Sequence, residues 1–167
     1  MTDPAAGASA GWSVLNLGDA KAYTNPKSGT ILALESEDLP WREVGLNVRV
    51  LEPGQPACAY HGENAQEDFL VLHGECVLVV EDEERRLRRW DLVHCEPWTR
   101  HVFVGAGSGP CAILMIGARK DPEEFVYPVS EAAARYEASV GEETRDPGEA
   151  YAEWPRGSGP HAARWPL

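Results

Sequence analysis

The stretch that most constrains this chain spans residues 54–74 and carries His61, Glu63 and Glu67 at fixed spacing. His61 and Glu63 are two residues apart, so on an extended strand their side chains point to the same face. A short polar turn, residues 64–66, follows, and Glu67 then begins a second apolar run. The stretch therefore predicts two adjacent strands that direct an imidazole and two carboxylates toward one interior, where they could hold a divalent metal.

This spacing resembles the first motif of the cupin family, G-x5-H-x-H-x3-E-x6-G. From His61 onward, Glu67 and Gly74 fall in register with the motif. The chain departs from it at Glu63, which stands where the family usually has a second histidine, and at Gly54, which lies one residue further out. The resemblance implies an antiparallel jelly-roll β-barrel with a metal site in its interior.

The second cupin motif, G-x5-P-x-G-x2-H-x3-N, is expected after a hairpin, and residues 90–105 supply a matching strand-loop-strand pattern. His101 falls at the histidine of this motif. The resemblance covers residues 44–118. The other fixed positions of the second motif have changed: Trp90 replaces Gly, Glu96 replaces Pro, Trp98 replaces Gly, and Gly105 replaces Asn.

The resemblance implies that His61, Glu67 and His101 bind the metal. Burying a carboxylate such as Glu67 at the head of an apolar strand is costly unless a cation pairs with it. Glu63 is either a fourth ligand or a solvent-facing turn residue. With Glu63 the set would be two imidazoles and two carboxylates, which favours zinc, iron or manganese over copper.

Two aromatic residues are predicted to line the same interior as the metal ligands. Phe69 shares a strand face with Glu67, and Phe103 shares one with His101, because residues two apart on a strand point the same way. His94 lies outside the motif position, and we interpret it as a core histidine or as one that supports a ligand.

Short apolar runs with turn signals at regular spacing predict an all-β chain, built as an antiparallel sandwich or barrel. No helical pattern separates the runs, which disfavours a parallel α/β fold. The expected organisation is a flexible tail over residues 1–11, a cupin jelly roll over residues 12–128, and a helical and irregular extension over residues 129–167. Within the first part of the jelly roll, we expect a strand at residues 12–17 and a loop at residues 20–28.

The C-terminal extension contains two helix-start signals. Ser130 can cap a helix over residues 131–140, and Asp146 followed by a proline can cap a second short helix that ends near Trp154. The remaining residues, 155–167, are rich in proline and glycine and are predicted to be irregular, with Trp154 and Trp165 packing against the domain.

Several of the predicted strands are apolar at every position, as in the run at residues 111–116. In a sheet with one solvent-exposed face, apolar and polar residues would alternate along each strand. Their outward faces need cover, because bare apolar strands invite aggregation. A homodimer would supply this cover, and the alternative is cover by the N-terminal segment and by residues 130–167.

Composition restricts the partners that the chain can have. The formal net charge is −12, and such a surface repels phosphate backbones and anionic lipids, so neither nucleic acid nor membrane is an expected partner. No apolar run approaches the roughly 20 residues that cross a bilayer, and the N-terminus lacks the pattern of a signal peptide. Four cysteines stand singly in apolar segments, as reduced buried thiols do. A cytoplasmic location is therefore expected.

Two classes of function stay open on the sequence. The first is a metal-dependent enzyme acting on a small organic molecule, with dioxygenase-like oxidation ahead of a sugar-type isomerisation. The second is a non-catalytic cupin that binds a small molecule or metal as a sensor or store. No residue besides the ligands stands out as a general base, which weakens the isomerase interpretation, because proton transfer needs one.

Overall fold

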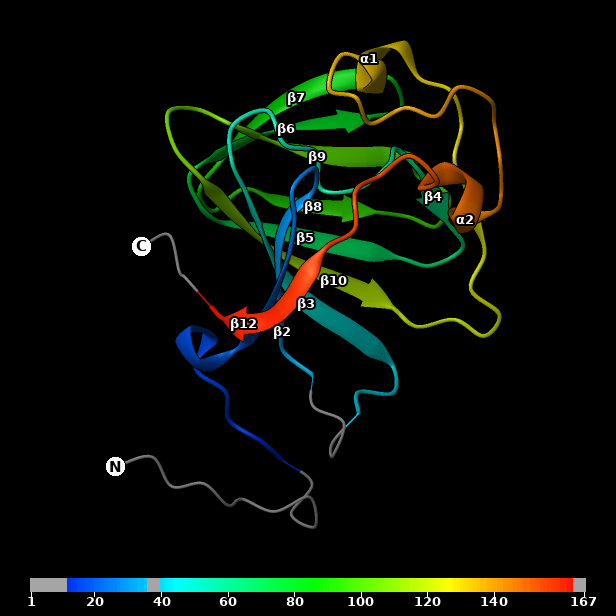
Figure 1. The fold of residues 1–167 in the computed structure, drawn as a ribbon. Helices are drawn as coiled ribbons and strands as arrows, with labels where there is room; N and C mark the ends of the chain where they lie inside the picture. Colours follow the sequence, from blue (N-terminus) through cyan, green and yellow to red (C-terminus); the bar gives the residue numbers. More distant parts are fainter. Residues whose placement is uncertain (1–11, 36–39, 164–167) are drawn as a thin grey trace.

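The structure is a computed structural model that describes residues 12–35 and 40–163, and nearly all of its regular structure is antiparallel β (Figure 1). The predicted all-β antiparallel fold class is confirmed. The strands of the described residues are, in chain order, β1 (Lys21–Asn25), β2 (Gly29–Ala33), β3 (Val44–Leu51), β4 (Gly62–Glu63), β5 (Glu67–His73), β6 (Glu75–Val80), β7 (Glu83–Arg88), β8 (Leu92–Cys95), β9 (His101–Ala106), β10 (Cys111–Ala118), β11 (Phe125–Val126) and β12 (Ser158–Ala162).

The strands form one large sheet and two small ones. The large sheet has the order β12-β1-β2-β3-β10-β5-β8, and the small sheets have the orders β7-β6-β9 and β11-β4. Figure 1 shows β7, β6 and β9 stacked as a layer beside the strands of the large sheet. The core between the layers contains residues of both, such as Phe69 and Ile113 from the large sheet and Leu78 and Phe103 from the small one. This interior is where the predicted site lies.

Strand β3 has its polar face turned inward. Val48 is buried in the cluster on the other face of the large sheet, together with Leu32 and Ala112. Arg49 pairs in register with Ile113, whose side chain belongs to the interior core. Because side chains alternate along a strand, the polar residues of β3 point into the barrel. A polar face that is buried in this way indicates a functional interior.

Two expectations for the first strands are wrong. The expected strand at residues 12–17 is absent, and a short 3-10 helix (Leu17–Asp19) is found there instead, capped by the Asn16 side chain. The expected loop at residues 20–28 contains β1, which pairs with β2. The turn signal at Asn25 is a hairpin turn between two strands, because its side chain accepts a hydrogen bond from the backbone of Lys27 at 2.9 Å. The expected tail over residues 1–11 lies outside the described residues.

Both helix-start predictions in the extension are confirmed, but the helices are shorter than expected. Ser130 caps α1 (Glu131–Ala134), and Asp146 caps α2 (Pro147–Ala150). Helix α1 ends early because the chain turns at Glu137, whose φ is 56°. None of the helices in the described part of the chain is long and apolar enough to cross a membrane.

The predicted irregular segment after residue 155 contains a strand. Residues Ser158–Ala162 form β12, which pairs with β1 at the edge of the large sheet. This pairing brings the C-terminal extension to the side of the barrel, as Figure 1 shows. Trp154 packs against Tyr151 with ring centroids 5.0 Å apart, as expected, and Trp165 lies outside the described residues.

Part of the extension covers the outer face of the three-stranded sheet. Ala132 and Ala133 of α1, with Ala138 after it, pack in one buried cluster with Val79 and Val102. Cover by residues 130–167 was the expected alternative to a homodimer, and on this face these residues supply it. The homodimer stays a prediction.

Candidate metal centre

Three of the predicted ligands come together in the interior. His61, Glu67 and His101 each place a ligand atom within 4.8 Å of the others. His101 begins β9 and is bridged to His61 by two backbone hydrogen bonds of 2.8 and 3.2 Å, while Glu67 begins β5 in the large sheet. The group therefore spans the gap between the sheets.

The expectation that two adjacent strands carry these ligands needs correction. Strand β4 pairs with β11, and β5 pairs with β10 and β8, so β4 and β5 belong to different sheets. The polar turn at residues 64–66 carries the chain across from one sheet to the other rather than closing a hairpin. The ligands converge because the two sheets face each other.

Both imidazoles are held in the same orientation by their own backbone. Nδ1 of His61 lies 3.0 Å from the carbonyl oxygen of Ala59, and Nδ1 of His101 lies 3.0 Å from that of Thr99. A carbonyl only accepts, so each Nδ1 carries the proton and each Nε2 keeps a free lone pair. The Nε2 of His101 lies 3.4 Å from the Glu67 carboxylate. Histidines that bind metals are oriented in this way, and two imidazoles with one carboxylate suit zinc, iron or manganese, so the residues fit a divalent ion.

Burial shifts the pKa values of two members of this group, and so sets their charges. Burial, assisted by the nearby Glu63 carboxylate, raises the pKa of Glu67 to about 7. Burial, assisted by the neighbouring His61, lowers the pKa of His101 to about 3. His101 is therefore neutral at physiological pH, as a metal ligand must be, and Glu67 is poised between its two forms.

Metal affinity is expected to weaken as the pH falls below 7, because Glu67 must lose its proton to become a ligand and its pKa is about 7. The affinity should decrease by up to about tenfold per pH unit from this group alone. His101 adds nothing in this range, because its pKa is about 3. Calorimetric titration of the metal-free protein with Zn²⁺ or Mn²⁺ over this pH range measures the effect.

The matched control for the pH dependence is Glu67→Gln, which cannot titrate. It should bind metal more weakly at neutral pH and should lose the part of the pH dependence that Glu67 causes. An identical pH dependence in the variant and in the wild type would contradict the assignment of Glu67.

Glu63 is near the group but is not one of its three members. It lies on β4 opposite Phe125 of β11, and it lines a cavity of about 330 Å³ together with Glu67. Burial raises its pKa, and the nearby His61 opposes that shift. Glu63 is thus a half-buried strand residue rather than a solvent-facing turn residue, and its role as a fourth ligand stays a prediction.

The two predicted aromatic residues lie directly against His101. The ring of Phe69 meets that of His101 edge-on at 5.1 Å, and the rings of Phe69 and Phe103 are 4.6 Å apart. Both phenylalanines are buried. They form an apolar layer beneath the metal group and fix the imidazole of His101, while their contact with a ligand stays a prediction.

Sequence reasoning missed several residues around His61. Tyr127 stacks on its ring at 5.8 Å, and the Sγ of Cys58 lies 3.6 Å from its Nδ1. Burial raises the pKa of the Cys58 thiol to about 12, so it remains protonated beside the imidazole. The polar positions of β3 were a signal that could have drawn attention to Arg49, which is half-buried. Tyr127 lies far along the chain in a segment without a strong pattern, so no such signal pointed to it.

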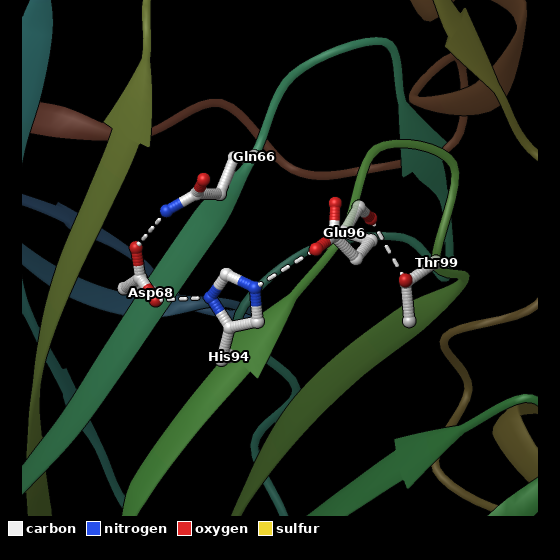
Figure 2. A network of polar contacts seen from close by, with 5 residues as sticks. All are labelled: Gln66, Asp68, His94, Glu96 and Thr99. Carbon is white, nitrogen blue, oxygen red and sulfur yellow. Dashed lines mark hydrogen bonds and ion pairs between the residues drawn. The ribbon is translucent and has the colours of Figure 1, made fainter.

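The expectation for His94 is wrong. It lies on β8, and its side chain is half exposed on the outside of the barrel. Its Nδ1 lies 2.7 Å from the Asp68 carboxylate and its Nε2 lies 3.4 Å from that of Glu96, and both contacts are drawn in Figure 2. These hydrogen bonds to Asp68 and Glu96 raise the pKa of His94. The alternation of β8 turns His94 to solvent, because its neighbour Cys95 is buried.

Comparisons with known proteins support the fold and the family. The model of the Cupin domain family matches residues 47–117. No curated protein matches the chain. The matched segment contains the whole metal group, and the chain has the antiparallel sheets of the cupin jelly roll. Residues 47–117 are therefore a cupin domain.

Solved structures with the same fold differ in what they are said to do. A cupin-superfamily sugar phosphate isomerase from Silicibacter pomeroyi is 21% identical, with a TM-score of 0.59, and the alignment covers 81% of this chain and 94% of that one. A polyketide cyclase from Streptomyces resistomycificus is 16% identical, with a TM-score of 0.57 and coverage of 65% and 80%. A protein provisionally described as a sugar phosphate isomerase, from Acidithiobacillus ferrooxidans, is 25% identical, with a TM-score of 0.51; the alignment covers 61% of this chain and 65% of that one, slightly under two thirds.

Proposed function

We propose that this cupin is a metal-dependent enzyme that acts on a small organic molecule by proton transfer, as an isomerase does. The observation that supports it most is that Glu67 of the metal group and Glu63 outside the group line one cavity of about 330 Å³. A molecule in this cavity would meet both the metal group and a second carboxylate. In this proposal Glu63 serves as a base separate from the three metal ligands.

Each set of residues has a separate role in this proposal. His61, Glu67 and His101 would hold the ion, which supplies Lewis acidity to polarise an oxygen of the bound molecule. Glu63 would take a proton from the carbon next to the carbonyl carbon and return it to the carbonyl carbon, while the proton of the neighbouring hydroxyl passes to the former carbonyl oxygen, so that an aldose becomes a ketose. The buried layer of Phe69 and Phe103 keeps water away from the imidazole side of the group.

The cavity favours an uncharged molecule over a phosphate ester. Its wall carries four carboxylates, and its one arginine, Arg119, is already paired with one of them, Glu35. A phosphate dianion would meet repulsion there without a free cation to balance it. We therefore propose an aldose, a hydroxyaldehyde or a similar hydroxy-carbonyl compound as the substrate class.

Dioxygenase-like oxidation is the second candidate, and a different observation supports it. Two histidines with one carboxylate are the ligand types of oxygen-activating non-haem iron centres. The apolar layer beneath His101 also suits a site that excludes water. This candidate requires iron(II), whereas proton transfer would also proceed with zinc or manganese.

Two measurements on metal-loaded protein separate the candidates. Proton transfer predicts that deuterium from D₂O enters aldoses and hydroxy ketones at the carbon next to the carbonyl, which NMR detects. Glu63→Gln should slow this exchange by about a hundredfold or more while the metal content stays unchanged. Oxidation instead predicts oxygen uptake by the iron(II) form with catechols, keto acids or thiols.

Glu124→Gln is a matched control, because Glu124 is an exposed carboxylate whose backbone carbonyl accepts a 3.0 Å hydrogen bond from the N–H of Asn64, the residue after Glu63. It should leave the exchange rate unchanged. If a compound binds while neither deuterium exchange nor oxygen uptake rises above that of the His61→Ala/His101→Ala protein, the protein is a binding module rather than an enzyme.

A further inference from the structure

A second cavity, of about 490 Å³, is lined by Arg49, which belongs to the same inward polar face of β3 as Asn47 in the wall of the first cavity. Its wall contains Arg49 and Cys58 from the cupin domain and Tyr151 and Trp154 from the C-terminal extension. Tyr23 of β1 completes the aromatic part of the wall. None of the three metal ligands lines this cavity, so it is distinct from the cavity next to Glu67.

Arg49 is a cation without a counterion in this wall. No ion pair among residues 12–35 and 40–163 involves it, and its one hydrogen bond there joins Nη1 to the carbonyl oxygen of Ser28 at 3.3 Å. Its Nε is sealed from solvent and has no hydrogen-bond partner within the same described residues. Burial lowers the pKa of Arg49, yet a guanidinium keeps its charge in proteins. Arg49 is half-buried as a whole, and leaving such a partly enclosed cation unpaired costs free energy that an anion would offset.

The rest of the wall includes aromatic and aliphatic side chains. Tyr151 and Trp154 meet edge to face with their centroids 5.0 Å apart, and Ile31 stands next to Arg49 in the register of β2 with β3. The hydroxyl oxygen of Tyr151 accepts a 3.2 Å hydrogen bond from the backbone N–H of Ala59, which holds the Tyr151 side chain in place. Aromatic walls of this kind hold planar apolar groups.

We propose that this cavity binds a small monocarboxylate with a planar apolar body, its carboxylate on Arg49 and its body between the aromatic side chains. The guanidinium matches a carboxylate through paired N–H donors. A single cation balances one negative charge, whereas a phosphate dianion needs further donors. The net charge of −12 also disfavours more highly charged ligands.

The site goes beyond the proposed enzymatic function and does not depend on it. Cys58 lines the cavity and contacts Nδ1 of His61, so a bound carboxylate would lie behind that histidine, away from its Nε2. The ligand therefore needs no bound metal. Binding can be measured on metal-free and on metal-loaded protein, and failure in both forms bears on this site alone.

Benzoate and benzamide are matched probes, because they share the planar body and differ in the charge. In proton–nitrogen NMR spectra, the Nε–H signal that disappears in Arg49→Gln identifies Arg49. Benzoate is expected to shift this signal saturably in the wild type. Arg49→Gln should bind benzoate about tenfold or more weakly, and benzamide should bind both proteins equally. The variant should fold, because it removes an unpaired charge from a half-buried position.

Arg86→Gln is the control variant, because Arg86 is exposed on β7. It should keep the benzoate affinity of the wild type. Equal binding of benzoate and benzamide by the wild type would overturn the proposal, and this test needs no variant. Three other results would also overturn it. They are unchanged benzoate affinity in Arg49→Gln, the absence of saturable benzoate binding, and tighter binding of phenyl phosphate than of benzoate.

Discussion

Replacing both His61 and His101 with alanine is expected to reduce bound divalent metal from about one ion per chain to trace levels. The two imidazoles are two of the three groups that converge within 4.8 Å, and a lone Glu67 cannot hold an ion in a buried site. Elemental analysis of protein made in metal-supplemented medium measures the content. Metal removal should also lower the melting temperature of the wild type and leave that of the double variant unchanged.

His94→Ala is the matched control for this experiment, because His94 is a histidine on the outer face of the barrel. It should retain the metal content of the wild type. Equal trace metal in the wild type and in the double variant would show that the site assignment is wrong. Glu63→Gln provides the finer test: a lower metal affinity would make Glu63 a ligand, and an unchanged one would remove it from the ligand set.

Restoring the cupin residue at position 105, by Gly105→Asn, is expected to cause the largest loss of stability. A Cβ at this position would lie 2.2 Å from the carbonyl oxygen of Glu52 and 2.8 Å from its carbonyl carbon. Both are backbone atoms and cannot rotate away. The free energy of unfolding should fall by about 3 kcal/mol or more, because overpacking here must shift the backbone itself. Urea denaturation measures the change.

The backbone around Gly105 explains why the approach is so close. Its N–H donates to the carbonyl of Gln55 at 2.9 Å, and its carbonyl accepts from Gly54 at 2.8 Å. The glycine thus ties β9 to the loop that leads to His61. Gly109→Asn is the control, since nothing lies within 4 Å of its Cβ position, and it should change the stability by less than about 0.5 kcal/mol. Similar losses in both variants would contradict the steric explanation.

The resemblance to the two cupin motifs was sufficient to predict the metal group, although the strands that carry its members belong to different sheets. His61, Glu67 and His101 lie together as predicted. The same reasoning failed for the arrangement of strands, since pairing between β4 and β11 or between β1 and β12 depends on contacts that no local pattern specifies. The departure at Gly105 looked like a weakness of the second motif, and the structure explains it by the approach of the Glu52 backbone.

The alternation along β3 was visible in the sequence, but its orientation was not. A polar face usually points to water, and here it points inward, so the alternation alone did not indicate that Arg49 faces the interior. Tyr127 and Tyr151 were hidden for another reason. Tyr127 lies just before the extension, and Tyr151 follows α2 within it. Their approach to the barrel depends on packing of the segments around the short helices, whose sequence signals fix the start but not the direction.

The pairing of β1 with β12 has a consequence for the order in which the molecule is assembled. Thr24 and His161 are joined by a 2.9 Å hydrogen bond across 137 positions of sequence, whereas the metal group spans residues 61–101. Closing the longer loop costs more chain entropy and comes later in folding. The metal-binding side chains can therefore meet before the wall around Arg49 is complete, so the chain is expected to be able to acquire its ion before it can recognise an organic ligand.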